Sequence, residues 1–202
     1  MNVAVKSKSV KEYIIKYNDL ESYTDFFKIL PKLKRKAARN NKIGIEYKNN
    51  ILYDDSQEIN ELKDLLQIIT ALNIKNKKER YEYIYDTVCD YLDNEFKNNN
   101  YCDFKCNQCT YYRNMYPSRK EDGCCFSPNV GLCKYLINHR CTIKSISCKL
   151  HVCQHLKKQG VHFKINDIPL LKHFFNIRQK TIIGISFFTD KEEVINRLVR
   201  LV

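Results

Sequence analysis

The sequence predicts a mainly α-helical protein with minor β structure, an α+β fold in which two helical halves flank an irregular cysteine-rich segment. Apolar residues recur at helical spacing in both halves, and a single stretch alternates between apolar and polar residues. Nine of the ten cysteines fall between residues 101 and 155. With 202 residues and 44% hydrophobic content, the chain is long enough for an apolar core. We therefore expect one compact domain with three regions, residues 1–100, 101–155 and 156–202.

The N-terminal region begins with a helix signal and continues with a hairpin signal. Ser9 and Glu12 have capping-box spacing, which predicts a helix from near Val10 that ends by Pro31 and is either continuous or broken around Asn18. The stretch "IGIEYKNNILYD" alternates around the turn residues Lys48–Asn50 and predicts a β-hairpin near residues 43–54.

Two helices are expected after the hairpin. Their apolar stripes have the three- and four-residue spacing of a buried helix face. The stripes consist of Ile59, Leu62, Leu65, Leu66, Ile69 and Leu72, and of Tyr81, Tyr85, Val88, Leu92 and Phe96. Each stripe needs a partner element to cover it.

The C-terminal region returns to ordinary helical sequence with short breaks. Gly160 is a predicted helix C-cap, and "VHFKI" after it is a predicted strand. Asp167 is a predicted N-cap before "IPLLKHFF", and Thr189 with Glu192 predicts a capping box before the final helix.

The chain carries a formal net charge of +12. A basic balance of this size suits a polyanion partner or an acidic protein. Lysine is abundant along the whole chain, so general compositional bias is the competing explanation. Only "KLKRKAARNNK", residues 32–42, concentrates the charge, and it is either a solvated face or an anion-contacting surface.

The N-terminus lacks the apolar run and cleavage site of a secretory signal, and no segment is apolar enough to span a bilayer. We therefore expect a cytoplasmic protein with no membrane partner. Thiols stay reduced in that compartment, so dense cysteines indicate metal binding or redox chemistry rather than disulfides.

The cysteine spacing is C-x3-C-x2-C-x14-CC-x7-C-x7-C-x6-C-x4-C. Two thiolates separated by two residues can be presented to one metal by a single tight turn. We expect metal ligation by Cys102, Cys106, Cys109, Cys124, Cys125, Cys133, Cys141, Cys148 and Cys153. The tenth, Cys89, lies beside a helical apolar stripe and is expected to be a core cysteine.

The run "GLCKYLINHRCTIKSISCKLHVC", together with the preceding "CC", resembles the CxxCxxCC family of zinc- or iron-chelating cysteine-cluster proteins. The resemblance covers Cys106 to Cys153 and implies a metal site, with Cys153 as a trailing cysteine. Fourteen residues separate the C-x2-C pair from the CC here, whereas only a few do so in the family. The layout "YDTVCDYLDNEF…CDFK" is also similar to that of cysteine-rich clostridial proteins, which implies no function.

The spacing of "CDFKCNQC" is similar to the C-x3-C-x2-C of radical S-adenosylmethionine enzymes. Gln108 stands where those enzymes usually carry an aromatic residue. The chain after Cys109 is also too short for the (β/α) barrel that should follow. We therefore disfavour radical chemistry.

Zinc and iron–sulfur centres both accept four thiolates, so spacing does not separate them. The uneven gaps and the single C-x2-C favour iron–sulfur, such as [4Fe–4S], over zinc. His151 and His155 would share a helical face with Cys148 if residues 145–156 form one helix. We expect these histidines to be exposed or packing residues, with metal ligation as the alternative.

Two functions remain. The first is an iron–sulfur protein with a redox or protein-modification role and an acidic protein partner. The second is a structural zinc protein that binds nucleic acid through a basic, tyrosine-rich surface, with packing as the alternative role of these tyrosines. Its residues would be Tyr111, Tyr112 and Tyr116 for stacking and Arg113, Arg119 and Lys120 for phosphate. No catalytic triad, phosphate loop or carboxylate pair is apparent, so whether the protein is an enzyme stays open.

Overall fold

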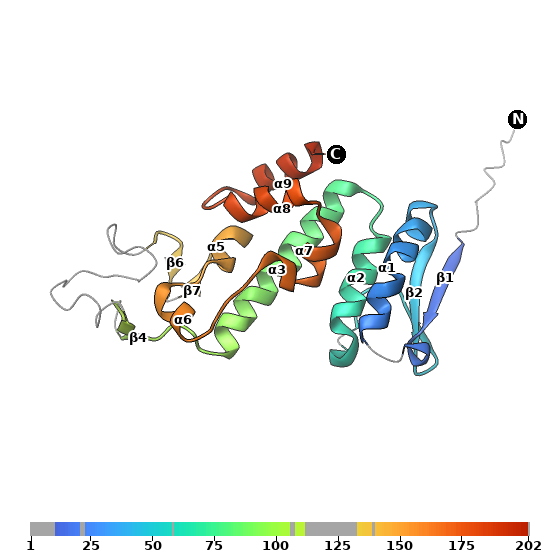
Figure 1. Cartoon of the computed structure of the whole chain (residues 1–202), viewed down its shortest axis with the longest axis horizontal. Coiled ribbons are helices and arrows are strands. Elements are labelled where there is room, and N and C mark those ends of the chain that lie inside the picture. The colour runs from blue at the N-terminus through green and yellow to red at the C-terminus, as the bar shows by residue number, and fades with distance from the viewer. Residues whose placement is uncertain are drawn as a thin grey trace, which may run out of the picture. The chain divides into compact units, whose positions relative to one another are not determined.

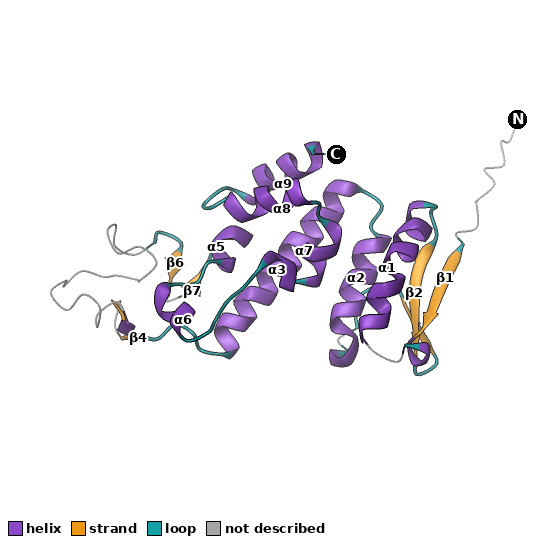
Figure 2. Cartoon of the chain, in the orientation of Figure 1, coloured by secondary structure: helices purple, strands orange, loops and turns teal. Residues whose placement is uncertain are grey.

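The protein is mainly α-helical with a small amount of β structure, as the sequence predicts (Figures 1 and 2). The computed structural model describes residues 11–20, 23–57, 59–105, 108–111, 133–138 and 140–201. These group into two compact units, Met1–Arg80 (unit 1) and Tyr81–Val202 (unit 2). The expectation that the whole chain forms one compact domain stays a prediction.

Unit 1 is a three-stranded sheet with two helices against one face (Figure 2). Its elements are β1 (Glu12–Lys16), η1 (Tyr17–Asp19), α1 (Tyr23–Ala38), β2 (Lys42–Tyr47), β3 (Asn50–Leu52), η2 (Asn60–Leu62) and α2 (Lys63–Asn73). β1 is parallel to β2, so α1 is the crossover between them, and β3 pairs antiparallel to β2. The β2–β3 hairpin lies where the sequence predicts one. Its turn residues, Lys48 and Asn49, both have positive φ, as the favoured two-residue hairpin turn requires.

The predicted helix over Val10–Pro31 is wrong. Residues Glu12–Lys16 form strand β1, and α1 begins only at Tyr23 and continues through Pro31. β-branched Ile14 and Ile15 suit a strand, and pairing with β2 supplies the backbone hydrogen bonds. A local capping pattern cannot predict strand β1, because its partner strand β2 comes after α1 in the sequence.

Asn73, at the end of α2, links that helix to the sheet through side-chain hydrogen bonds. Its amide oxygen accepts from the Ile43 N–H at 2.8 Å, and its amide nitrogen donates to the carbonyls of Ile43 and Tyr53, each at 2.8 Å. Between helices and sheet lies the apolar core: Ile15, Phe26, Leu30, Leu33, Ile43, Ile45, Leu52, Leu65, Leu66, Ile68, Ile69 and Leu72. The two helices and the sheet therefore enclose the core of unit 1.

Unit 2 is built around α3 (Lys77–Asn98). Residues 81–98 of this helix belong to unit 2. Its other helices are α5 (Ile146–Leu150), α6 (Gln154–Lys158), η3 (Ile165–Asp167), α7 (Pro169–Phe174), α8 (Ile177–Ile185) and α9 (Lys191–Arg200). Two tiny antiparallel hairpins pair β4 (Phe104–Lys105) with β5 (Gln108–Cys109), and β6 (Leu136–Ile137) with β7 (Arg140–Cys141). The apolar stripe predicted for α3 is buried at Tyr81, Tyr85, Val88 and Leu92.

Three aspartates on one side of α3 each bind a lysine from another segment. Asp86 accepts from Lys191 at the start of α9 at 2.6 Å, and Asp90 accepts from Lys144 just before α5. Asp93 accepts from Lys149 of α5, whose side chain is only 3% exposed. The Lys149–Asp93 pair is the most sensitive to mutation, because an ammonium group that is buried without a partner destabilises the fold.

A buried hydrogen-bond network joins α8 to its neighbours. Gln179 is 3% exposed, and its amide nitrogen donates to the Tyr81 hydroxyl at 2.8 Å and to the Leu198 carbonyl at 3.0 Å. Gln179 also completes a capping box with Asn176 at the start of α8. The side chain therefore starts one helix and links it to α3 and α9.

Three local predictions for the C-terminal region are wrong. The predicted strand "VHFKI" is a loop that leads into η3, α7 is capped by Ile168 rather than Asp167, and Asp190 rather than Thr189 caps α9. Asp190 accepts from the Glu192 N–H at 2.8 Å, and its carboxylate suits the positive end of the helix dipole. Gly160 is confirmed at the end of α6, with φ 83° and a Schellman pair of hydrogen bonds.

Replacing Asp93 by Ala should destabilise unit 2 more than replacing Asp90 by Ala. The first change leaves buried Lys149 without its partner, whereas Lys144 returns to water in the second. We expect about 2–3 kcal/mol for Asp93→Ala, below the range for a fully buried pair because Asp93 is half-exposed, and under about 1 kcal/mol for Asp90→Ala. Urea unfolding of both variants measures this, and equal losses would contradict the role given to Lys149.

Candidate metal centre

The two short hairpins of the cysteine-rich segment have the same pattern of strand pairing. In the first, Phe104 pairs with Cys109 and Lys105 with Gln108. In the second, Leu136 pairs with Cys141 and Ile137 with Arg140. Each hairpin thus has two paired positions, two intervening residues in the sequence, and a cysteine at the end of its second strand.

A threonine directly after each cysteine closes the hairpin. The Thr110 N–H donates to the Asp103 carbonyl at 2.9 Å, and the Thr142 N–H donates to the Tyr135 carbonyl at 2.8 Å. The threonine hydroxyls return to the same residues, to Oδ2 of Asp103 at 2.8 Å and to the carbonyl of Tyr135 at 2.9 Å. Residues 103–110 and 135–142 are therefore equivalent eight-residue hairpins that end in Cys-Thr. The sequence alone does not show this repeat, because Cys-Thr is its only shared signal.

Cys148 lies in α5, which is held against α8. The hydroxyl of Ser147 donates to the Ile183 carbonyl, and the hydroxyl of Ser145 donates to the Ser186 carbonyl at 3.2 Å. The Cys148 Sγ accepts a hydrogen bond from the Phe188 N–H at 3.4 Å. This contact links the Cys148 sulfur to the loop that follows α8.

Cys141 lies within electrostatic reach of Cys148. Partial burial is the largest cause that raises the pKa of the Cys141 thiol, while the Ile143 N–H and the Lys149 ammonium lower it. The Cys148 thiol also raises that pKa. The second hairpin and α5 therefore bring two predicted ligands into one neighbourhood.

A second neighbourhood forms around Cys153. This residue is the N-cap of α6, and His155 lies in the first turn of the same helix. The His155 ring stacks on the Tyr111 ring, with 3.4 Å between ring centroids and 22° between planes. Tyr111 follows Cys109 by two residues, so the stack brings the end of the first hairpin against the start of α6. Cys109 itself is buried, at 3% exposure.

The remaining predicted ligands differ in exposure or lie outside the described residues. Cys102 and Cys141 are exposed, while Cys133, Cys148 and Cys153 are half-buried. Cys106, Cys124 and Cys125 lie outside the described residues. Within the described ranges, no three His, Cys, Asp or Glu side chains gather closely enough to hold a metal ion. The nine-cysteine ligand set therefore stays a prediction.

Neither His151 nor His155 shares a helical face with Cys148. Helix α5 ends at Leu150 and α6 begins at Gln154, so the two are separate helices. His151 is exposed and contacts the edge of Phe187, with ring centroids 6.0 Å apart. In contrast, Nε2 of His155 is buried and has no hydrogen-bond partner among the residues that the structure describes.

Cys89 is confirmed as a core cysteine. It is fully buried in α3, and burial, the largest cause, raises the pKa of its thiol to about 12. Lys149 and Lys144 oppose that shift. The thiol therefore stays protonated at neutral pH and is unsuited to metal binding.

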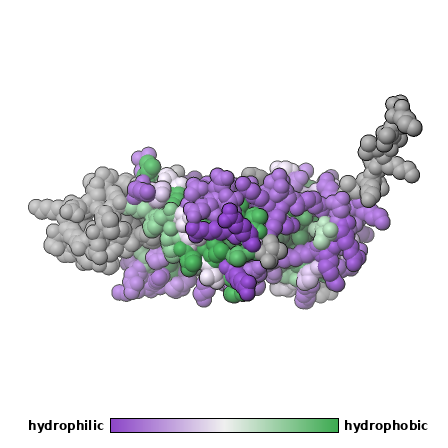
Figure 3. Space-filling view, turned by 90° about the horizontal axis from the view of Figure 1, so that it is seen from above, coloured by the Kyte–Doolittle hydropathy of each residue, from purple (hydrophilic) through white to green (hydrophobic). Residues whose placement is uncertain are grey.

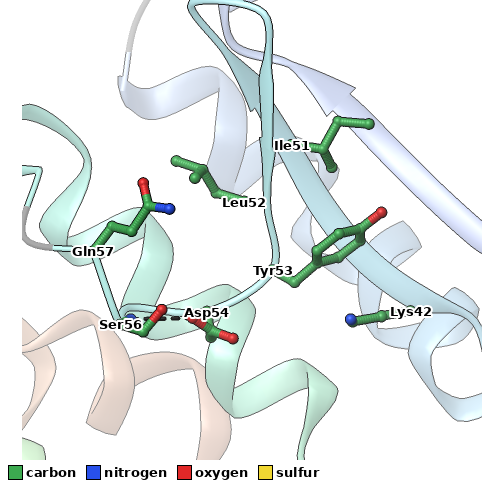
Figure 4. A pocket seen from close by; sticks show the side chains of 7 residues that line it. All are labelled: Lys42, Ile51, Leu52, Tyr53, Asp54, Ser56 and Gln57. Carbon is green, nitrogen blue, oxygen red and sulfur yellow. Dashed lines mark hydrogen bonds between the residues drawn. The ribbon is translucent and has the colours of Figure 1, made fainter.

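A pocket of about 200 Å³ lies in unit 1, along β3 and the loop that follows it (Figure 4). It is lined by Lys42, Ile51, Leu52, Tyr53, Asp54, Ser56 and Gln57. A Cβ on Gly44 would approach the Tyr53 ring to 2.9 Å, so the glycine lets this ring lie across β2. The Lys42 ammonium lies 3.9 Å from the centroid of the Tyr53 ring.

The basic run over residues 32–42 lies on α1 and the start of β2. Lys32 and Lys36 place their ammonium groups 5.4 and 5.3 Å from the centroid of the Tyr13 ring. Of the residues proposed for base stacking, Tyr111 has one ring face covered by His155. Tyr112, Tyr116, Arg113, Arg119 and Lys120 lie outside the described residues.

Neither protein-family models, nor characterised proteins, nor solved structures give a match to this chain. The resemblance to the CxxCxxCC family therefore stays a prediction. In the part of the chain that the structure describes, no helix combines the length and the apolar character that a bilayer crossing requires.

Cys89 should make the fold sensitive to alkali. Its thiol titrates near pH 9 when unfolded and near pH 12 when folded, so its contribution to stability is complete below pH 9 and falls between pH 9 and pH 12. At pH 10 the loss from this residue is about 1 kcal/mol. Cys89→Val should remove that part of the loss and leave the part due to other groups whose pKa burial raises, such as Tyr85, whose pKa rises to about 12. Urea unfolding at pH 7.5 and pH 10 measures the difference, and identical losses in both proteins would refute the assignment.

Proposed function

We propose that the protein binds metal through its cysteine-rich segment and that thiolate ligation orders this segment. The observation that carries the proposal is the pair of equivalent hairpins, each ending in a cysteine that a following threonine fixes. Two-stranded hairpins of this length are not stable in water by themselves. Metal ligation supplies the missing stabilisation, because binding free energy becomes folding free energy in such segments.

The choice of metal lies between an iron–sulfur cluster and zinc. The uneven cysteine spacing favours iron–sulfur. The matched hairpins and the buried imidazole nitrogen of His155 favour zinc, whose structural sites combine thiolates from tight turns with histidine. We take zinc as the first metal to test. A redox or protein-modification role requires the iron–sulfur alternative.

An acidic protein is the partner that the surface near Cys148 favours. The loop between α8 and α9 carries exposed Phe187 and Phe188, and Tyr135 of the second hairpin stacks against Phe188 at 6.3 Å between ring centroids. Ile185 is 69% exposed beside them. The face that carries α8 and α9 shows hydrophobic residues among hydrophilic ones (Figure 3). Lys134 lies over the Tyr135 ring, and the net charge of +12 complements acidic residues around an apolar centre.

Protein purified without oxygen should contain stoichiometric metal. The visible spectrum, together with zinc, iron and sulfide analysis, identifies it: a colourless zinc protein or a brown protein bleached by dithionite. The double change Cys141→Ser and Cys148→Ser should lower the content by about one ion or cluster per chain, since each site needs four donors. Cys89→Ala is the matched control and should leave the content unchanged. Purified protein without any metal would contradict the proposal.

Nucleic-acid binding is the second candidate function, and unit 1 carries the observation that favours it. Lys32, Lys36 and Lys42 lie over tyrosine rings, and a pocket with polar Asp54, Ser56 and Gln57 opens beside Tyr53. Single-stranded nucleic acid is bound by this combination of aromatic surface and positive charge.

Binding of a short single-stranded oligonucleotide should weaken with salt, and each phosphate contact should add about 0.7 to the slope of log K against log salt. The triple change of Lys32, Lys36 and Lys42 to Gln should weaken binding and reduce that slope. A charge-matched control changes Lys16, Lys28 and Lys63 to Gln, because all three are exposed elsewhere in unit 1. Salt-independent binding, or equal losses per charge in the two variants, would count against this function.

A further inference from the structure

We infer that the outer edge of strand β1 pairs, in the antiparallel direction, with β1 of a second copy of this chain. Among the described strands only β2 pairs with β1, so β1 forms one edge of the sheet in unit 1 (Figure 1). The backbone N–H and C=O groups on such an edge can pair with a further strand. The inference concerns unit 1 and does not depend on the proposed metal binding.

The hydrogen bonds between β1 and β2 determine which residues of β1 face outward. The Lys42 N–H donates to the Lys11 carbonyl at 2.8 Å. In a parallel ladder every second residue bonds to the neighbouring strand, so Tyr13 and Ile15 also direct their backbone groups towards β2. The alternate residues direct their backbone groups away from β2. These residues are Glu12, Ile14 and Lys16.

An antiparallel pair centred on Ile14 uses all three outward residues. Ile14 faces its own copy across a two-fold axis, and Glu12 of each chain faces Lys16 of the other. These are the positions that exchange hydrogen bonds, because their backbone groups point away from β2. One register therefore satisfies the backbone of the edge and brings opposite charges together.

The charges on β2 extend this complementarity. Glu12 lies opposite Lys42, and Lys16 lies opposite Glu46, in the pairing of β1 with β2. Two copies therefore form, on each side of the axis, a row across four strands in which positive and negative residues alternate: Lys42, Glu12, Lys16 and Glu46. Charged residues on an edge strand usually prevent pairing. Here they favour it in this register, because opposite charges directly across a sheet stabilise the pair.

The middle of the paired edge is apolar. Ile14 lies opposite Gly44 of β2, and a Cβ on that glycine would approach Cδ1 of Ile14 and Cγ2 of Ile51 to 3.0 Å each. Both isoleucines therefore lie over the glycine, on one face of the sheet. Ile14 is half-buried and Ile51 is 46% exposed. In the paired state the two copies of Ile14 meet at the axis, and the burial of this apolar surface adds to the backbone hydrogen bonds.

The first test is the oligomeric state of the full-length protein. Sedimentation equilibrium should give twice the mass of one chain, and the dimer should dissociate on dilution. Glu12→Lys and Lys16→Glu should each weaken association at least about 10-fold, because the two-fold axis repeats every like-charge contact. The two changes together should restore association, since opposite charges then face each other again. Lys63→Glu is the matched control on an exposed position of α2 and should leave association unchanged.

The double variant separates pairing between chains from damage within a chain. Each single change also places like charges opposite each other on β1 and β2, so an effect within the chain would add up when both changes are combined. A double variant that associates no better than the single variants would overturn the inference. A single-chain mass at every concentration, or a dimer that neither single change weakens, would overturn it as well.

The second test uses the unmodified protein and does not depend on a variant that folds. Amide hydrogen exchange, followed by NMR, should be slower at the Ile14 N–H in concentrated protein than in dilute protein. The Tyr13 and Ile15 N–H groups should be protected at both concentrations, because they bond to β2. Fast exchange at Ile14 in both samples would show an unpaired edge and contradict the inference. Equally slow exchange in both would show that something other than a second copy covers the edge, which also contradicts it.

Discussion

The acidic side of α3 is the constraint on which unit 2 depends. Asp86, Asp90 and Asp93 are spaced by four and three residues, so they lie on one side of the helix, beside the buried stripe. Each one fixes a different segment, and Lys149 reaches Asp93 from a buried position. Apolar packing alone would let α5 slide along α3, whereas a buried ion pair has only one satisfactory register.

The position of α5 determines where Cys148 lies in unit 2. The serines of α5 bind carbonyls of α8 and its following loop, and Cys148 receives the Phe188 N–H from that loop. Phe188, which makes this contact with Cys148, has φ 56°. A positive φ is unusual for a residue other than glycine. Cys148 is thus positioned by helix packing, whereas Cys109 and Cys141 are positioned by hairpins with little packing of their own.

Much of the fold could be predicted from the sequence, because helix stripes and the Lys48–Asn49 hairpin are local patterns. Cys89 was placed in the core for the same reason, since its neighbours on α3 are apolar. β1 could not be predicted, because a parallel strand depends on a partner beyond α1 and the nearby capping signal favours a helix. The N-caps of α7 and α9 each lie one residue after the predicted one. In α7 the helix begins at Pro169, a favoured first helical residue, so Ile168 takes the N-cap position, and in α9 Asp190 caps the helix in place of its neighbour Thr189.

The site was less predictable than the fold, because ligands meet through tertiary contacts. Spacing predicts a set of cysteine ligands, and His151 and His155 would share a face with Cys148 only if residues 145–156 formed one helix. The break at His151–Cys153 separates them, so His155 turns to Tyr111 and the first hairpin while His151 stays near Phe187. The segment thus presents two donor neighbourhoods, one around Cys153 and one around Cys148, each combining a hairpin with the start of a helix.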